Sequence, residues 1–241
     1  METTTSAPST ALVPSGWQDV PALVCGFGNR VAGAPATTLL LRRQVHGDRV
    51  VDAATAPRAL KDAPDAHPRL DVEADAIVVR TAGVIGGVRT ADCVPILLVA
   101  PEHRWAAAVH AGWRGTIAGI ARVAVDHAAG DGVPASALQA ALGPSIGPCC
   151  YEVSQDLAER FSADGYPVLR PGSGGQPRLD LRSINARVLV RAGLAPGRIQ
   201  FCGPCTRCAV SLYHSFRAEP GCEGRQVSWI GWRDRTRLPD R

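Results

Sequence analysis

The sequence predicts one mixed α/β domain in which sheets are covered by helices, and three observations support this class. Short apolar segments with the composition of strands recur along the chain, and about three longer segments repeat apolar residues at helical spacing. No linker divides the 241 residues into parts. We therefore expect a flexible leader over residues 1–16 and a single domain over residues 17–241.

The first part of the domain is predicted to consist of strands and turns. Leu39–Leu41 begins a strand–turn–strand unit that turns at Gly47-Asp48. Residues 56–75, which contain three prolines, predict a surface loop. Ile77–Val79 and Val84–Val88 predict two further short strands.

The clearest local prediction is a β-hairpin of two apolar runs, Val94–Ala100 and Trp105–Val109, joined by Pro-Glu-His-Arg. A helix over residues 116–129 is expected to follow it. The remaining predicted elements are a strand at Ala137–Leu142, helices at Tyr151–Phe161 and Ser183–Gly193, and strands within residues 197–203 and 224–232.

The composition narrows the class of protein. Hydrophobic residues make up 46% and charged residues 20% of the chain, which is ordinary for a globular protein. The formal charge is only +4 and the arginines are scattered, so no nucleic-acid partner is expected, and no apolar run is long enough to predict a membrane span. The N-terminal segment lacks the features of a secretory signal, so we expect a cytoplasmic protein whose eight cysteines stay reduced.

Chemistry is predicted at the outer ends of the hairpin. Cys93 precedes the first apolar run and His110 follows the second. A two-residue loop would place the two side chains directly opposite each other, and a four-residue loop would make them diagonal neighbours on the same face. Such a pair suits a shared metal ion or a thiolate–imidazole pair, although a cysteine beside an apolar strand is more often part of the core. Asp92 and Arg114 gather at the same end, which is typical of a site built on a rigid scaffold.

A third ligand is best supplied by His46, which lies at a strand end before a glycine turn. His67 and His103 fall in the predicted loop and at the hairpin turn, and His127 falls in the following helix. One thiolate with two imidazoles leaves one tetrahedral position open, which is the catalytic rather than the structural pattern for zinc.

Several segments together resemble the laccase-domain (multicopper polyphenol oxidase-like) family, whose members are described as zinc-dependent purine nucleoside phosphorylases or as a peptidoglycan editing factor. These segments are RQVHG, ADAIVV, TADCVPILL, AAVHAGWRG, LGPSIGPCCYEV, LDL…N and CT…YHSFR…GRQ, over about residues 22–232. The resemblance implies an α/β/β/α sandwich and zinc, or copper, held by His46, Cys93 and His110. It also implies phosphorolysis of a purine nucleoside such as adenosine, inosine or methylthioadenosine, with adenosine deaminase as a side activity.

Phosphorolysis needs an anion site, and the bidentate fork of arginine suits phosphate. We expect Arg114 and Arg217 in this role, with Ser215 in the late motif YHSFRA and Arg30 in the turn GFGNRVAG as further contacts. Both segments depart from the family's usual GFSTR-GG and FFSYRR. The expected catalytic set is Cys93, His110, Asp92 and Arg114, in which Asp92 would support its neighbours by a hydrogen bond or a cap.

Other functions use the same residues differently. With Cys93 as nucleophile and His110 as base, the protein would be an amide hydrolase acting on peptidoglycan precursors. A non-catalytic, metal-stabilised binding module would need a fourth protein ligand. Polyphenol oxidation by several coppers is disfavoured, because the chain has six histidines, no His-x-His pair and Met1 as its only methionine. Copper at the same three ligands would give weak oxidase activity.

The remaining cysteines carry weaker motifs. Pro204–Cys208 and Cys150–Glu152 imitate the two halves of the zinc-deaminase motif across a long gap, and Cys202, Cys205 and Cys208 imitate an iron–sulfur run without a close fourth cysteine. Cys149 and Cys150 lie in a Gly/Pro turn that leads into a helix. We interpret Cys202, Cys205 and Cys208 as packed thiols near a turn. The family resemblance makes one exception, because it places Cys205 and Thr206 near the active site.

Overall fold

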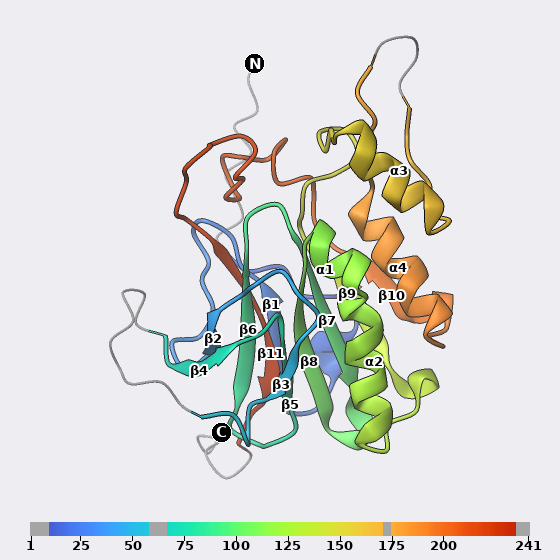
Figure 1. Ribbon diagram of the computed structural model, residues 1–241. Coiled ribbons are helices and arrows are strands. Elements are labelled where there is room, and N and C mark those ends of the chain that lie inside the picture. The colour runs from blue at the N-terminus through green and yellow to red at the C-terminus, as the bar shows by residue number, and fades with distance from the viewer. Residues whose placement is uncertain (1–9, 58–66, 171–174, 235–241) are drawn as a thin grey trace.

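Two mixed β-sheets face each other, and the α-helices lie on the outer side of one of them (Figure 1). The computed structural model describes residues 10–57, 67–170 and 175–234. In spatial order, the five-stranded sheet contains β1 (Leu23–Phe27), β11 (Gln226–Trp232), β6 (Ile85–Thr90), β2 (Leu39–Arg43) and β4 (Arg69–Glu73). The six-stranded sheet contains β10 (Ile199–Phe201), β9 (Gln139–Leu142), β7 (Val94–Ala100), β8 (Trp105–Ala111), β5 (Ala76–Val79) and β3 (Val50–Asp52).

The helices pack against the six-stranded sheet. They are α1 (Trp113–Ala118), α2 (Ile120–Gly130), α3 (Gln155–Ala163) and α4 (Leu181–Arg191), with short 3-10 turns at Trp17–Asp19, Pro101–His103, Ala135–Ala137 and Pro196–Arg198. Their apolar side chains share one core with that sheet. No helix within the described ranges combines the length and apolar composition that crossing a bilayer requires. The predicted mixed α/β class is confirmed.

The hairpin of β7 and β8 is central because its two faces belong to two different cores. Ile96 and Leu98 pack with the helices, whereas Leu97 and Val99 belong to the core that faces the five-stranded sheet. Every residue of both strands is buried. Since side chains alternate between the two faces of a strand, burial on both faces explains the continuous apolar runs in the sequence.

The pairing in the hairpin decides between the two predicted loop lengths. Ala100 pairs with Trp105, and Pro95 pairs with His110. The loop therefore contains four residues, and Cys93 is the diagonal rather than the direct neighbour of His110. Both side chains lie on the face that is directed toward the five-stranded sheet.

The prediction of a loop over residues 56–75 was partly wrong. Arg69–Glu73 forms strand β4, which pairs in parallel with β2 and buries Leu70 completely. The three prolines predict irregular backbone, but pairing with a strand some thirty residues away outweighs this local tendency. Residues 58–66 of the same prediction lie outside the described residues.

Helix boundaries also differ from the prediction for identifiable reasons. The helix expected over residues 116–129 is divided at Gly119, whose φ of 85° is the left-handed conformation that ends α1. The helix expected from Tyr151 begins only at Gln155, because the Ser154 hydroxyl accepts a hydrogen bond from the Leu157 N–H and acts as the N-cap.

The N-terminal edge of the five-stranded sheet was not predicted. The turn expected over Gly26–Gly33 starts inside β1. The observed turn is closed by the side-chain Oδ1 of Asn29, which accepts hydrogen bonds from the Val31 and Ala32 N–H groups. Within the predicted leader, Leu12 forms two backbone hydrogen bonds with Phe27. Residues 1–9 lie outside the described residues, and the boundary of the leader stays a prediction.

Candidate active site

Three side chains converge where the two sheets end. Cys93 and His110 lie at matching ends of β7 and β8, and His46 follows β2 of the opposite sheet. Their ligand atoms all lie within 4.8 Å of one another, and the two imidazole rings meet edge to face. His110 is buried, Cys93 is half-buried and His46 is exposed. The group, which we call the triad, therefore opens toward solvent on the His46 side.

A buried carboxylate, that of Asp75, connects the two histidines. It accepts hydrogen bonds from the His46 and Gly47 N–H groups at 2.9 and 2.8 Å and from the Val45 N–H at 3.2 Å. Three successive N–H groups around a left-handed residue form a nest for an anion, and His46 has a φ of 60°. The same carboxylate lies 2.8 Å from Nδ1 of His110, so Nε2 is the nitrogen left to face Cys93.

Close packing around the triad requires unusual backbone. Asp92, next to Cys93, has a φ of 87°, which is rare for any residue other than glycine. A Cβ at Gly112 would lie 2.9 Å from the Cys93 sulfur and 3.2 Å from the His46 ring. Only glycine permits this approach, so the chain keeps the sulfur and both rings close at the expense of local strain.

Electrostatics favours charge separation within the triad. Burial alone raises the pKa of the Cys93 thiol, but the positive charge of His110 and hydrogen bonds from both histidines lower it to about 6. Burial likewise lowers the pKa of His110, yet the charges of Cys93 and Asp75 and their hydrogen bonds raise it to about 9. Burial raises the pKa of Asp75, and the His110 hydrogen bond with the surrounding N–H groups lowers it overall. The thiolate, and the His110 imidazole once a metal ion displaces its extra proton, are donors that a soft or borderline metal ion prefers.

The carboxylate of Asp92 points away from the triad and holds two loops. One oxygen accepts a hydrogen bond from the Thr206 hydroxyl at 2.6 Å, and the other accepts one from the Arg217 N–H at 2.7 Å. Its backbone carbonyl accepts a hydrogen bond from the Ile146 N–H. Asp92 is therefore a positioning residue, which ties the strand end that carries Cys93 to the loops around the cavity.

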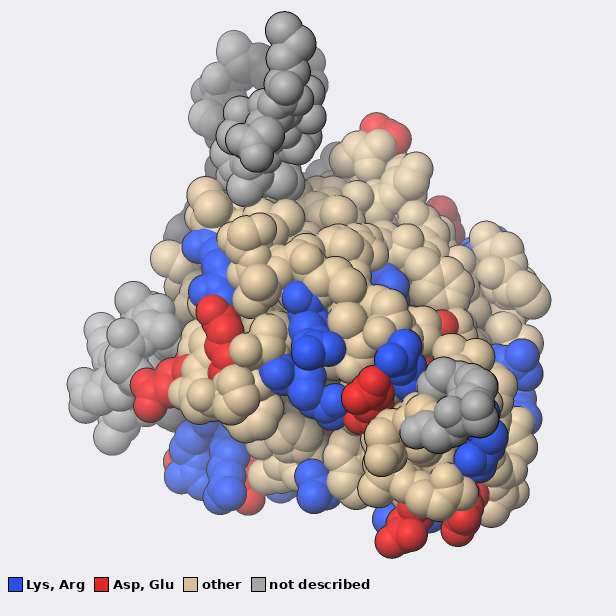
Figure 2. All heavy atoms as spheres, turned by 90° about the horizontal axis from the view of Figure 1, so that it is seen from above, with Lys and Arg blue, Asp and Glu red and all other residues tan. Residues whose placement is uncertain are grey.

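A cavity of about 370 Å³ lies beside this group, and Trp113, Tyr151, Glu152, Val153, Ser154, Leu157, Gln176 and Arg217 line it. The triad does not line the cavity directly. Tyr151, which lines the cavity, lies near the triad, because its phenol interacts electrostatically with Cys93 as well as with Arg217 and Arg114. Figure 2, the view from above, shows Lys and Arg side chains gathered near the middle of the face that carries the loop before β11.

The two arginines expected at a phosphate site both lie near the cavity. The Arg114 guanidinium stacks on the Trp113 ring at 4.3 Å. The Arg217 guanidinium lies 5.4 Å from the Tyr151 ring and donates a hydrogen bond to the Glu152 carbonyl at 3.0 Å. Each arginine thus rests on an aromatic wall of the cavity, with further N–H groups available.

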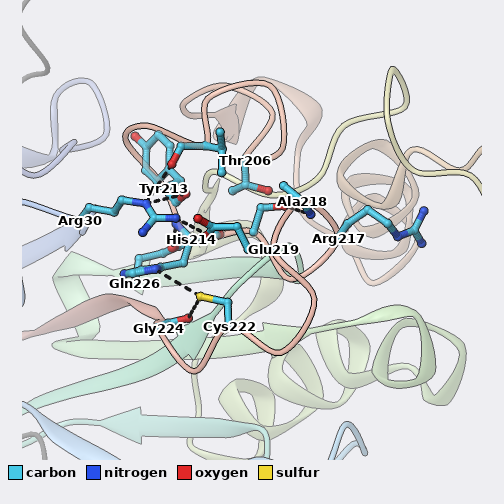
Figure 3. Close-up of polar contacts among 12 residues, drawn as sticks. Arg30, Thr206, Tyr213, His214, Arg217, Ala218, Glu219, Cys222, Gly224 and Gln226 are labelled. Carbon is cyan, nitrogen blue, oxygen red and sulfur yellow. Dashed lines mark hydrogen bonds and ion pairs between the residues drawn. The ribbon is translucent and has the colours of Figure 1, made fainter.

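The other two expected phosphate contacts are not brought to the cavity. The Arg30 guanidinium pairs with Glu219 and donates to the Val210 and Tyr213 carbonyls. Ser215 is fully buried, and its hydroxyl accepts a hydrogen bond from the Ala218 N–H. Figure 3 shows Arg30 directed into this loop, whereas Arg217 extends away from it. Arg30 and Ser215 therefore hold the loop before β11, and neither is part of the proposed phosphate site.

Sequence reasoning missed Asp75, Trp113 and Tyr151. Asp75 was visible as an acidic residue directly before the apolar strand β5, a position where a carboxylate is buried and needs partners. Trp113 and Tyr151 belong to two of the segments that resemble the family. Half-buried aromatic residues are common, however, and only their place in the cavity wall distinguishes these two.

Comparison with known proteins agrees with this architecture. A family model described as multi-copper polyphenol oxidoreductase laccase matches residues 17–233. Adenosine deaminase RL5, from an unknown prokaryotic organism, is 37% identical over 202 residues, which cover 82% of this chain and 76% of that protein. Purine nucleoside phosphorylase YlmD of Geobacillus stearothermophilus is 34% identical over 203 residues, 79% of this chain and 71% of that one.

A solved structure shows the same fold. The crystal structure of YlmD from Geobacillus stearothermophilus aligns with a TM-score of 0.75 and 28% identity, over 89% of this chain and 93% of its own. Two facing sheets and their helices are thus shared along nearly the whole length. The chain belongs to the multi-copper polyphenol oxidoreductase laccase family.

Proposed function

We propose that this protein is a zinc-dependent purine nucleoside phosphorylase with adenosine deaminase as a side activity. Its substrates would be phosphate and adenosine, inosine or methylthioadenosine, and its products a free base and a sugar 1-phosphate. The observation that carries the proposal is the convergence of one cysteine and two histidines near a cavity that has aromatic walls and Arg217 in its lining, with Arg114 stacked on Trp113. The similarity to an adenosine deaminase and to a purine nucleoside phosphorylase supports the choice of substrate class.

The donor set of the triad fits a catalytic zinc ion. Cys93 has a low thiol pKa, and the second nitrogen of His110 is bonded to the buried Asp75, as is usual for a ligating histidine. Three protein ligands leave a position for substrate or water. When bound, the ion would supply a Lewis acid and lower the pKa of a water molecule. Copper prefers similar donors, so it is the competing metal.

The cavity residues would bind and orient the two substrates. The volume of the cavity, about 370 Å³, falls in the range of small-molecule sites. Trp113 and Tyr151 present the rings against which a purine can stack, and Arg217 can offer N–H groups to phosphate. Burial, with the negative charge of Cys93, raises the pKa of the Tyr151 phenol, so this group stays protonated and can donate a hydrogen bond to the departing base.

Asp92 would link the two halves of the site. Its carboxylate holds the backbone of Arg217 while its own backbone continues into Cys93. A shift of the phosphate-binding loop is thereby coupled to the end of β7. We expect Asp92 to act through position rather than by proton transfer, because both of its oxygens already accept hydrogen bonds.

The proposal is tested by incubating the purified, zinc-analysed protein with a panel of purine nucleosides, with and without phosphate. Free base that is released only with phosphate, together with one equivalent of sugar phosphate, supports phosphorolysis. Ammonia released from adenosine supports the deaminase activity. A zinc-loaded protein that releases neither base nor ammonia from any nucleoside contradicts the proposal.

The amide hydrolase predicted as the alternative would use Cys93 as its nucleophile. The low pKa of Cys93 is compatible with that role. The two functions differ in their need for metal: a hydrolase of this type stays active after chelation and is inactivated by alkylation of Cys93. The proposed phosphorylase loses activity on chelation and regains it with zinc.

A further inference from the structure

Four cysteines that the proposed reaction does not use lie together in the loops after β9 and β10. Cys149, Cys150, Cys205 and Cys208, which we call the four-cysteine cluster, place their sulfur atoms within 4.8 Å of one another. The Cys208 sulfur is 3.6 Å from that of Cys149 and 3.4 Å from that of Cys150. Cys202, the fifth cysteine of this region, is buried in the core between the sheets instead.

These separations match a single tetrahedral ion. Metal–sulfur bonds of about 2.3 Å in a tetrahedron place neighbouring sulfurs about 3.8 Å apart. A disulfide requires about 2.05 Å, and a cluster of several irons would hold its four thiolates farther apart. We propose that the four-cysteine cluster binds a second metal ion of the zinc class, in a closed tetrathiolate site.

The surrounding backbone already prepares this arrangement. The Gly147 N–H donates a hydrogen bond to the Cys205 sulfur at 3.2 Å, and a Cβ at Gly147 would lie 3.3 Å from the Cys149 sulfur. Ser145 and Cys205 form a parallel bridge, with the Thr206 N–H bonded to the Ser145 carbonyl at 3.0 Å. Two loops distant in sequence are thus held together by main-chain bonds that do not depend on the ion.

The site would serve the cavity without taking part in the reaction. Tyr151 follows Cys150 directly, and Thr206, which donates to Asp92, follows Cys205. Four protein ligands leave no position for substrate, which is the structural pattern for zinc. The ion would therefore hold both Tyr151 in the cavity wall and Thr206, the partner of Asp92, in place. This role does not depend on which reaction the triad performs.

The decisive measurement is the metal content of the purified chain by mass spectrometry. Wild type produced with sufficient zinc is expected to hold two equivalents, and the double variant Cys205→Ser/Cys208→Ser one. Cys93→Ala is also expected to hold one equivalent, because it loses the ion of the triad and keeps the ion of the four-cysteine cluster. Cys25→Ala is the matched control: its thiol is only partly exposed and belongs to no metal-ligand group among the described residues, so this variant keeps two.

A second measurement keeps the proposal testable if the double variant fails to fold. Cys93→Ala, loaded with cobalt, is expected to show the visible and sulfur-to-metal absorption of a tetrahedral tetrathiolate ion. A mercurial reagent should release that ion as four thiols react. One equivalent in wild type together with no such absorption in Cys93→Ala overturns the proposal. A disulfide between Cys208 and Cys149 or Cys150, found by non-reducing peptide mapping, overturns it as well.

Discussion

The triad and the four-cysteine cluster both gather metal-ligating side chains, but the fold builds them in opposite ways. The triad lies at strand ends of two facing sheets, mixes one sulfur with two imidazoles, and leaves His46 exposed. The cluster lies on two loops and offers four sulfurs and no imidazole. An open, mixed donor set favours chemistry on a substrate, whereas a closed set of thiols favours stability. If both sites bind metal as proposed, the number of protein ligands, rather than their proximity, separates a catalytic site from a structural one.

Cys93→Ala should produce the largest effect and separate the two sites. Removing the only sulfur of the triad is expected to lower phosphorolysis about a thousandfold or more, because electrostatic stabilisation of this kind is the largest single contribution to catalysis. The four-cysteine cluster should keep its ion. Steady-state kinetics and metal analysis of the same preparation check both statements, and loss of both equivalents of metal would show that the two sites are not independent.

Asp75→Asn should weaken metal binding by the triad and leave metal binding by the four-cysteine cluster unchanged. The amide keeps the shape of the carboxylate but loses the charge that orients His110 and fills the nest at residues 45–47. Loss of such a partner typically costs 10–100-fold in metal affinity or activity. Titration against a chelator measures the affinity directly. Unchanged zinc affinity in this variant would mean that His110 is held by its packing alone.

Cys208→Ser should act mainly on stability. Loss of a bound ion that adds about 3 kcal/mol to the stability of the folded state would lower Tm by about 6–12 °C in a chain of this size. Activity at a temperature below the transition is expected to fall less than tenfold, because the triad is intact. Thermal scans with and without added zinc, beside Cys25→Ala, test this. A Tm equal to that of wild type would contradict a structural role.

The smallest expected effect is a pH dependence confined to the triad. Because the pKa of Cys93 is lowered to about 6, its thiolate persists to that pH and is protonated below it, so alkylation of Cys93 in metal-free protein should be half-maximal near pH 6. Burial raises the pKa of Cys25 to about 12, so this thiol should stay unreactive throughout and serves as the internal control. Site-resolved mass spectrometry gives both profiles, and a midpoint for Cys93 near that of an ordinary thiol would contradict the ion pair with His110.

Part of the candidate site was accessible from local patterns. The two apolar runs of the hairpin fixed which face Cys93 and His110 share, because side chains alternate along any strand. The carboxylate of Asp75 was not assigned, because Asp75 and its partners at residues 45–47 and at His110 come from three separate segments. Likewise, Cys205 and Cys208 lacked a close fourth cysteine in the sequence, and Cys149 and Cys150 reach them across more than fifty residues.

The sequence by itself determined the α/β class, the central hairpin, the candidate ligands and a helix predicted at Ser183–Gly193, which the structure has at Leu181–Arg191. Periodicity and residue type are properties of short segments, so these features need no distant contacts. Only the tertiary structure decided the hairpin register, the pairing of β4 with β2 and the break at Gly119. It also decided which cysteines lie in the triad and which form the four-cysteine cluster. Those features depend on contacts between distant segments, whose free energies outweigh local preference once the two sheets pack.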